Sequence, residues 1–311
     1  MSNEPKAYRN IKDLAREELI LPGTPLCGGC GGLEVLRLAS KVLGERVVFV
    51  NAAGCFTLLA LFPYTPFRGS WLYTTMASAP AGAQGVRDAL DILRAKGRLS
   101  PEEDLQVVVV AGDGSTYDMA LSATSGTLHR NLDYWYLCYD NEAYGNTGMQ
   151  QSSATPFGAR TATTPGGAGG AVDGLLGKKD IFEIWRAHRP PYIATVSPRH
   201  PIDLARKFEK AKQLKGPKLF LAFAPCPTGW GYDPARTQAY ARLGVECGLF
   251  PLKEAVYGEV THTYVKRTWR PVEEYLRGQG RFEHLFEPVR QEALLHLLQE
   301  GVDRYWAGVP R

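Results

Sequence analysis

The sequence has no long apolar run and no excess of charge of one sign. Its longest apolar stretch, residues 56–62, is far shorter than the roughly 20 residues of a membrane-spanning helix. Lysine and arginine exceed aspartate and glutamate by only four residues (36 against 32), with no dense basic cluster. We therefore expect neither a membrane nor a nucleic-acid partner. The first twenty residues also lack the apolar core of a signal peptide, so a cytoplasmic location is expected.

Cysteine and histidine are scarce, with six of each among 311 residues. We assign none of the histidines to catalysis, because their spacing gives only weak ligand pairs. A disulfide framework is not expected in a reducing cytoplasm, so the cysteines need another explanation. Two of them, Cys138 in an apolar strand pattern and Cys247 in a helical one, are expected to be buried, inert thiols.

A βαβ unit is predicted in the middle of the chain. The β-branched run 107–110 is typical of a buried strand, and a glycine-rich turn, 111–116, follows it. After a helical segment, a second predicted strand, 134–139, leads into Asn141. Because parallel strands end at the same edge of a sheet, where ligands bind, we expect Asp113 and Asn141 to lie close together.

Further patterns predict a doubly wound, mostly parallel α/β sheet with a helical C-terminal extension. Strand patterns cover 46–51, 192–196 and 218–224, and a helical pattern covers 201–215. We divide the chain into an N-terminal lead-in (1–20), a main domain (21–250) and a helical extension for subunit packing (251–311).

The predicted turn has the composition of a phosphate and metal site. Gly112 and Gly114 allow backbone amides to approach a phosphate closely. Asp113 offers an anionic oxygen, and Asn141, 28 positions later (141 − 113), offers a neutral one. Such oxygens suit Mg²⁺. A Gly-Asp-Gly turn alone is weak evidence, since ordinary turns favour the same residues; the Asn at this spacing strengthens the hypothesis.

The remaining cysteines suggest a metal centre. Cys27 and Cys30 form a CxxC pair, and Cys55 and Cys226 follow predicted strands beside glycine or proline. A thioredoxin-like dithiol needs no further cysteines, and zinc ribbons usually have two CxxC pairs. One pair with two isolated cysteines fits a [4Fe–4S] cluster better, although zinc remains an alternative.

The Asp113–Asn141 spacing resembles the thiamine diphosphate motif, in which Asp, Asn and a backbone carbonyl hold the metal that bridges the diphosphate. The resemblance implies Mg²⁺ ligands at Asp113, Asn141 and the carbonyl of Ala143. It also implies a thiamine diphosphate-binding main domain. The implied cofactor-binding residues are Gly54, Gly112, Asp113, Gly114, Ser115, Thr116, Asn141, Tyr144, Asn146 and Thr147.

Five motifs in the same order resemble the β subunits of 2-oxoacid:ferredoxin oxidoreductases of the pyruvate type. They are LCGGCG from Leu26, NAAGC from Asn51, GDGST from Gly112, DNEAYGNTG from Asp140 and APCPTG from Ala224. The resemblance implies that Cys27, Cys30, Cys55 and Cys226 ligate one [4Fe–4S] cluster near the thiamine. It also implies that Asn146 contacts substrate as a catalytic residue. The small-residue segment 148–177 would be a loop over the cofactor.

The resemblance also predicts partners. Thiamine activation needs a carboxylate at the aminopyrimidine ring, which family enzymes supply from a pyrimidine-binding subunit. This sequence also lacks further CxxC motifs that could relay electrons. We therefore expect a second subunit at the thiamine site, a ferredoxin-like cluster subunit, and ferredoxin as the final acceptor. The alternatives are a non-redox thiamine decarboxylase or carboligase component with structural zinc, and an iron–sulfur scaffold protein.

Two departures from the pyruvate-type pattern concern the substrate. Residues 71–80 replace a segment that usually bears Asn and His, and Tyr117 and Met119 replace residues of the commoner GDG-x-x-Asp-Ile-Gly pattern. The resemblance is closest to oxalate oxidoreductase, which cleaves oxalate to two molecules of carbon dioxide. We therefore predict oxalate as the substrate, with pyruvate as the alternative.

Overall fold

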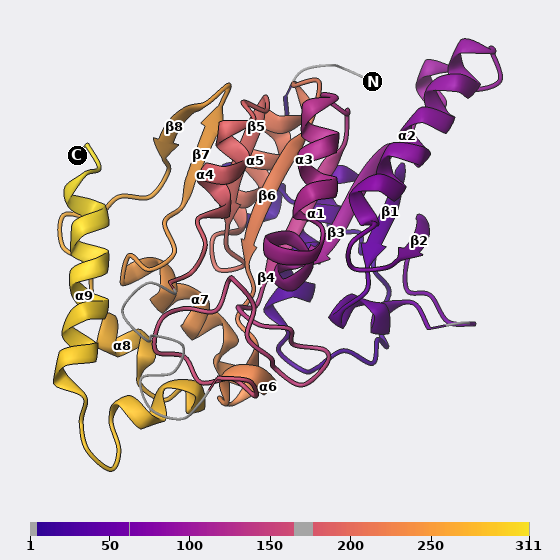
Figure 1. Cartoon of the computed structure of the whole chain (residues 1–311). Helices are drawn as coiled ribbons and strands as arrows, with labels where there is room; N and C mark the ends of the chain where they lie inside the picture. The colour runs from indigo at the N-terminus through magenta and orange to yellow at the C-terminus, as the bar shows by residue number, and fades with distance from the viewer. Residues whose placement is uncertain (1–4, 62, 165–176, 311) are drawn as a thin grey trace.

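A central sheet covered by helices on both faces forms the body of the protein (Figure 1). The computed structural model describes residues 5–61, 63–164 and 177–310. Residues 165–176, which belong to the expected loop over the cofactor, lie outside the described residues. The strands are β1 (Val47–Ala52), β2 (Ser70–Thr74), β3 (Gln106–Gly112), β4 (Trp135–Asp140), β5 (Tyr192–Val196), β6 (Lys218–Phe223), β7 (Lys253–Val256) and β8 (Glu259–His262).

Helices connect most of the strands. They are α1 (Gly31–Leu43), α2 (Ala79–Ala95), α3 (Leu121–His129), α4 (Ile181–Ala187), α5 (Pro201–Lys212), α6 (Pro227–Trp230), α7 (Thr237–Glu246), α8 (Val272–Leu276) and α9 (Glu292–Ala307). A π-helical turn, Gly114–Met119, precedes α3. Short 3₁₀ turns occupy Ile11–Asp13, Cys55–Leu59, Pro101–Glu103, Pro234–Arg236 and Gly280–Leu285. None of the helices in the described ranges has both the length and the apolar character needed to cross a membrane.

The strand order is β2-β1-β3-β4-β6-β5-β7-β8 across the eight-stranded sheet of the described residues. The first six strands are parallel, so the predicted doubly wound, mostly parallel fold is confirmed. The last two strands pair antiparallel, β7 with β5 and β8 with β7. The segment expected to be helical from residue 251 therefore begins with a hairpin that extends the sheet, and becomes helical at α8.

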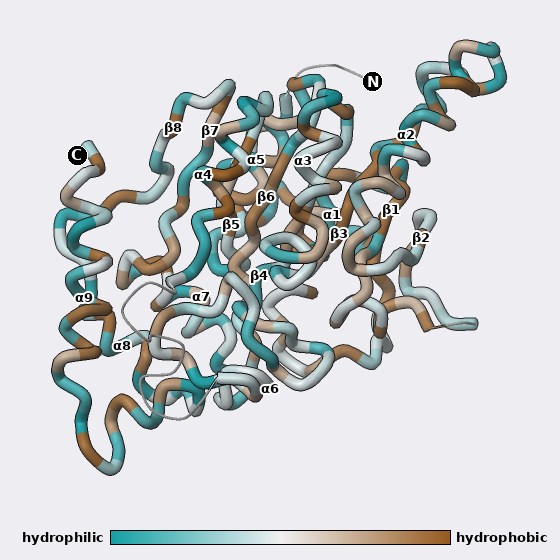
Figure 2. Tube along the Cα trace, in the orientation of Figure 1, coloured by the Kyte–Doolittle hydropathy of each residue, from teal (hydrophilic) through white to brown (hydrophobic). Residues whose placement is uncertain are grey.

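Side chains that alternate along the central strands build a core on each face of the sheet. On β4, Trp135 and Leu137 pack toward α1 and α5, whereas Tyr136 and Cys138 pack toward α2, α3 and α4. Hydrophobic residues consequently follow the central strands (Figure 2). Cys138 and Cys247 are both fully buried, which confirms their predicted environment.

A third apolar cluster joins the C-terminal helices to one end of the sheet. Phe223 at the end of β6 packs with Trp230, Tyr275 and Trp306, which come from α6, α8 and α9. In Figure 1, α8 and α9 lie at the left, on the β7–β8 side of the sheet, and α6 lies at the bottom centre, all of them far from α2. The extension is therefore part of the packed structure around the end of β6.

The strand order determines which chain segments meet at the carboxyl edge of the sheet. Strands β1, β3, β4 and β6 are consecutive neighbours and all run in the same direction. The residues that follow them, Cys55, Asp113, Asn141 and Cys226, therefore gather at one edge. This is the edge where parallel α/β sheets bind ligands.

Candidate metal and cofactor site

Three oxygen atoms converge where β3 and β4 end. The side-chain oxygen of Asn141 lies 2.8 Å from Asp113 Oδ1 and 2.7 Å from the carbonyl oxygen of Ala143. Both side chains are buried, and Asp113 is completely inaccessible. In this amide orientation neither the Asn141 oxygen nor the Ala143 carbonyl is a donor, so the oxygens repel one another unless a cation joins them, Asp113 is protonated or the amide turns over. The arrangement brings together all three residues that the sequence predicts as Mg²⁺ ligands.

The donor set fits a hard divalent cation. A carboxylate, an amide oxygen and a backbone carbonyl are oxygen ligands of the kind that Mg²⁺ takes, with phosphate oxygens and water completing its shell. In the described ranges no group of three or more His, Cys, Asp or Glu side chains could hold a metal ion. The three-oxygen set is not such a group, because only Asp113 contributes a carboxylate.

The Gly-Asp-Gly turn is held tightly by its neighbours. A Cβ atom on Gly114 would lie 2.3 Å from Cε1 of Tyr144, so only glycine fits there. The Ser115 hydroxyl donates to the carbonyl of Met76 (2.5 Å), and the Thr116 hydroxyl donates to the carbonyl of Gly112 (2.8 Å). Ser115 and Thr116 are predicted to bind cofactor, and these bonds show that their hydroxyls also fix the turn itself. A π-helical turn at this position is a feature often found at functional sites.

Burial and a neighbouring carboxylate control the protonation of Asp113. Desolvation raises the pKa of Asp113 well above its usual range, and the charge of Asp140 raises it further. The Ser152 hydroxyl donates to Asp113 Oδ2 (2.5 Å), and this bond lowers the pKa. A bound cation would also stabilise the charged carboxylate and so lower the pKa of Asp113. No pattern in the sequence distinguishes Ser152, which lies in a segment of many small polar residues.

The residues on both sides of Asn141 are fixed by buried ion pairs. Lys178 Nζ lies 2.6 Å from Asp140 Oδ2 and 3.1 Å from Glu142 Oε1. Tyr117 donates its hydroxyl to Asp140 (2.8 Å), so one departure from the family pattern supports this strand end. Glu142 has a left-handed backbone (φ +66°). The tripeptide around Asn141 is thereby held in one conformation by distant parts of the chain.

The C-terminal extension contributes directly to this arrangement. Arg281 pairs with Glu142 Oε2 (2.8 Å) and its guanidinium stacks 3.7 Å above the ring of Trp230. The indole N–H of Trp230 in turn donates to the backbone carbonyl of Asn141 (2.9 Å). Sequence reasoning assigned the extension to packing only, and no motif around Arg281 indicates this contact.

The loop after Ala143 is folded back over the Gly-Asp-Gly turn. The Tyr144 hydroxyl donates to Asp118 Oδ2 (3.1 Å), and Tyr144 pairs with Gln150 in an antiparallel bridge. Thr147 donates its hydroxyl to Gln150 Oε1 (2.5 Å). Asn146 and Thr147 are exposed at the loop tip. Asn146 is therefore available to a ligand or to another subunit.

The four cysteines of the predicted cluster site come from three segments that meet beside the oxygens. Cys30 caps α1, and the N–H of the next residue, Gly31, donates to the carbonyl of Pro225, directly before Cys226. Burial, together with the charges of Cys226, Cys30 and Asp113, raises the pKa of Cys55 to about 12. These mutual effects indicate that the thiols lie near one another. A Cβ on Gly145 would lie 3.3 Å from Cys55 Sγ.

Amide donors surround these thiols. The backbone N–H of Gly229 donates to Cys226 Sγ (3.4 Å). The backbone N–H groups of Leu33 and Gly32 hydrogen-bond Cys30 and partly offset the burial that raises the pKa of Cys30 to about 11. Such donors stabilise thiolates and their metal bonds. Cys27 is the exposed member of the set. The environment fits a [4Fe–4S] cluster. The thiolates around such a cluster lie farther apart than the ligands around a single metal ion, so the cysteines need not form a single-ion site.

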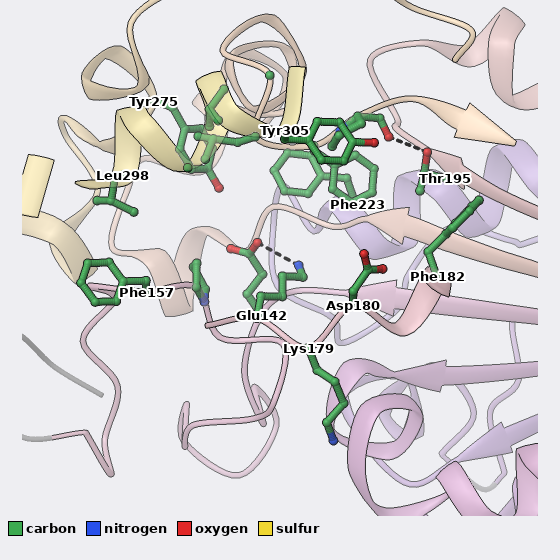
Figure 3. A pocket seen from close by; sticks show the side chains of 18 of the residues that line it. Glu142, Phe157, Lys179, Asp180, Phe182, Thr195, Phe223, Tyr275, Leu298 and Tyr305 are labelled. Carbon is green, nitrogen blue, oxygen red and sulfur yellow. Dashed lines mark hydrogen bonds and ion pairs between the residues drawn. The ribbon is translucent and has the colours of Figure 1, made fainter. Parts of the chain in front are cut away.

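A separate cavity of about 520 Å³ lies on the far side of Glu142. In Figure 3 the Glu142 carboxylate faces this cavity, with Phe157 and Leu298 to one side. The Glu142 carboxylate accepts a hydrogen bond from Lys178 (3.1 Å). The lining of the cavity includes neither Asp113 nor Asn141 nor any cysteine. We therefore place the candidate cofactor site at the strand ends and not in this cavity.

Comparison with known proteins identifies the family. The family model described as thiamine pyrophosphate enzyme, C-terminal TPP binding domain, matches residues 52–221. The pyruvate synthase subunit PorB of Methanocaldococcus jannaschii is 42% identical over 277 residues, covering 88% of this chain and 92% of that protein. The chain belongs to the β subunits of 2-oxoacid:ferredoxin oxidoreductases. The expected family is thereby confirmed, and the thiamine cofactor is supported by the matched domain.

A second relative and a solved structure are also similar to this chain. The ketoisovalerate oxidoreductase subunit VorB of Pyrococcus abyssi is 39% identical and covers 90% of each chain. Among solved structures, the 2-oxoglutarate:ferredoxin oxidoreductase of Magnetococcus marinus, with 2-oxoglutarate, coenzyme A and succinyl-CoA bound, matches with a TM-score of 0.54. It is 22% identical and covers 78% of this chain and 81% of that one, so it supports the fold alone.

Proposed function

We propose that this β subunit binds thiamine diphosphate through Mg²⁺ held by Asp113, Asn141 and the carbonyl of Ala143, and that Cys27, Cys30, Cys55 and Cys226 hold one [4Fe–4S] cluster beside it. The convergence of three oxygens at the strand ends carries the proposal for the metal. The amide-lined cysteines at the same edge support the cluster. Structural zinc at the cysteines is the competing hypothesis.

In this proposal, the residues of this chain bind the cofactors and orient the substrate. When bound, thiamine diphosphate supplies the nucleophilic carbon and the electron sink for cleavage of a 2-oxoacid, and the cluster accepts electrons for transfer to ferredoxin. Gly112 and Gly114 keep the backbone free of side chains where the diphosphate would lie. Asn146, exposed at the loop tip, is proposed to contact substrate. The thiamine-activating carboxylate and the later clusters are assigned to partner subunits.

Pyruvate is the first proposed substrate, because the relative at 42% identity is named a pyruvate synthase subunit. Oxalate remains a second candidate on one observation. Residues 71–80, which depart from the pyruvate-type pattern, contact two segments at the carboxyl edge. The Ser115 hydroxyl of the Gly-Asp-Gly turn donates to the carbonyl of Met76. The backbone N–H of Ala53, which follows β1, donates to the carbonyl of Thr74 (3.0 Å). Arg68 pairs with Glu17 and Glu45. Glu45 precedes β1, so this pair lies at the end of the strand opposite the candidate site, and we do not assign Arg68 to a second substrate carboxylate.

Anaerobic turnover by the complete complex tests this proposal. The complex is given a low-potential acceptor with pyruvate and coenzyme A, ketoisovalerate and coenzyme A, or oxalate alone. We expect acceptor reduction with pyruvate and coenzyme A. Reduction by oxalate alone would instead select the second candidate, and activity only with ketoisovalerate would reject both.

Metal analysis of the same preparation separates the cluster from zinc. We expect iron and acid-labile sulfide in equal amounts, and the loss of one cluster's share of both when Cys226 is replaced by alanine, because the clusters of the partner subunit stay. Loss of zinc without any loss of sulfide in that variant would contradict the cluster and favour a non-redox thiamine enzyme.

A further inference from the structure

Asn141 stands between the two centres that the proposed function assigns to this chain. Its amide oxygen faces Asp113 and Ala143, at 2.8 and 2.7 Å. Its amide nitrogen points the other way and donates to Cys55 Sγ at 3.9 Å. One side chain therefore reaches both the oxygen site and one of the four cysteines.

The amide has two orientations, and the contents of the oxygen site decide between them. With a cation bound, the oxygen must face the cation, so the nitrogen faces Cys55. Without a cation, turning the amide over allows the nitrogen to donate to Asp113 Oδ1 and to the carbonyl of Ala143, which relieves the oxygen–oxygen repulsion. The same rotation directs the amide oxygen at Cys55 and removes its donor.

The neighbouring glycine supports this contact independently. A Cβ on Gly145 would lie 2.8 Å from Asn141 Nδ2 and 3.3 Å from Cys55 Sγ. Any larger residue would enter the space between the amide and the sulfur. The backbone of Gly145 does not have a positive φ, so a left-handed conformation is not the reason for glycine at this position. Close approach is therefore the reason that a side chain does not fit there.

We propose that the Asn141 amide couples occupancy of the metal and thiamine diphosphate site to the reduction potential of the cluster. The inference rests on the proposed function. When the metal site fills, the amide donates to Cys55 Sγ, and a hydrogen bond to a cluster-ligating sulfur stabilises the more negative, reduced cluster. The potential rises, so the cluster accepts electrons more readily when the cofactor that delivers them is in place.

The test is an EPR-monitored redox titration of the anaerobic complex, stripped of cofactor and then reloaded with Mg²⁺ and thiamine diphosphate. We expect reloading to raise the potential of the cluster in the wild-type protein. Asn141→Asp keeps an oxygen for the metal but has no N–H donor, so the rise should be lost. Gly145→Ala changes neither charge nor ligand and should reduce the rise by displacing the amide from the sulfur.

Ser152→Ala is the matched control. This substitution removes a hydrogen bond to Asp113 but does not change Asn141 or Cys55. When the variant is fully reloaded with Mg²⁺ and thiamine diphosphate, the potential of its cluster should rise by as much as in the wild type. An equal rise in wild type, Asn141→Asp and Gly145→Ala would overturn the coupling while leaving both centres intact. A complex that loses no cluster signal when Cys226 is replaced by alanine, or one that never binds Mg²⁺ and thiamine diphosphate, would overturn the proposed function together with this inference.

Discussion

Gly114 illustrates how one missing methyl group shapes the site. A Cβ there would lie 2.3 Å from the Tyr144 ring, so Gly114→Ala should move that ring and break its bond to Asp118. We expect a loss of about 1–3 kcal/mol in the free energy of unfolding, as for other overpacked cores, and weaker cofactor binding. Urea denaturation measures the first effect, and calorimetric titration with Mg²⁺ and thiamine diphosphate measures the second.

Gly85 provides the control for that substitution. It lies inside α2 with no atom within 4 Å of an added Cβ. Gly85→Ala should therefore stabilise the protein by about 0.5–1 kcal/mol, because alanine loses less backbone freedom on folding. Equal destabilisation by both substitutions would show that the Tyr144 contact is not the cause.

The pKa of Asp113 predicts a pH-dependent metal affinity. Mg²⁺ binds the carboxylate, so its affinity should fall as the pH decreases through the raised pKa of Asp113. Ser152→Ala removes the hydrogen bond that lowers this pKa, so the fall should move to higher pH. Titrations with Mg²⁺ across a pH series measure the midpoint. Ser153→Ala is the control, since Ser153 contacts Asp118 through its backbone N–H; a shift of the same size there would contradict the assignment.

At the scale of single residues, the predicted ligands were easier to find than the residues that hold them in place. The sequence predicted that Asp113 and Asn141 lie close together, since both follow neighbouring parallel strands, and the family resemblance added Ala143. Ser152 and Trp230 could not, because a serine or a tryptophan gains its role only from a contact across the fold. Ser115 and Thr116 are expected to contact cofactor, and their hydroxyls also bond to the backbone of Met76 and Gly112.

At the scale of elements, the 3₁₀ turn Gly280–Leu285 contains Arg281, whose loss we expect to weaken both stability and metal binding. Arg281→Met removes the ion pair to Glu142 and leaves that buried carboxylate with Lys178 alone. We expect the free energy of unfolding to fall by about 3 kcal/mol, in the range for a broken buried pair, and Mg²⁺ affinity to fall with it. Urea denaturation and calorimetric titration measure both changes.

Arg290→Met is the matched control for this substitution. Arg290 pairs with Glu273 (2.6 Å) at a more exposed position in the same extension. Its loss should change stability by at most about 1 kcal/mol and leave Mg²⁺ affinity unchanged. Similar effects of the two substitutions would mean that the extension acts only through packing.

The elements that sequence patterns missed share a physical cause. The strands of the sheet interior are apolar on both faces, which gives a strong signal, and β1, β3, β4, β5 and β6 were all predicted. Edge strands are half solvated and short, and β2 and β8 carry mixed residues with exposed positions. Their pairing partners, not their own composition, make them strands.

At the scale of the whole molecule, the exposed loop tip at Asn146 implies a site completed by another subunit. We expect the isolated chain to bind Mg²⁺ and thiamine diphosphate without accelerating deuterium exchange at the thiazolium C2. Adding the pyrimidine-binding subunit should start that exchange, because it supplies the activating carboxylate. NMR of bound thiamine measures the rate. Rapid exchange in the isolated chain would mean that the activating group lies within these 311 residues.

The cysteines at the carboxyl edge come from positions that are 199 residues apart in sequence (226 − 27). A cluster held by them would cross-link the start of α1, the end of β1 and the end of β6, and closing such long loops strongly restricts the unfolded chain. Oxygen that destroyed the cluster would release all three segments at once. Oxidative damage would then loosen the folded subunit, expose it to proteases, and so clear inactivated enzyme from the cell.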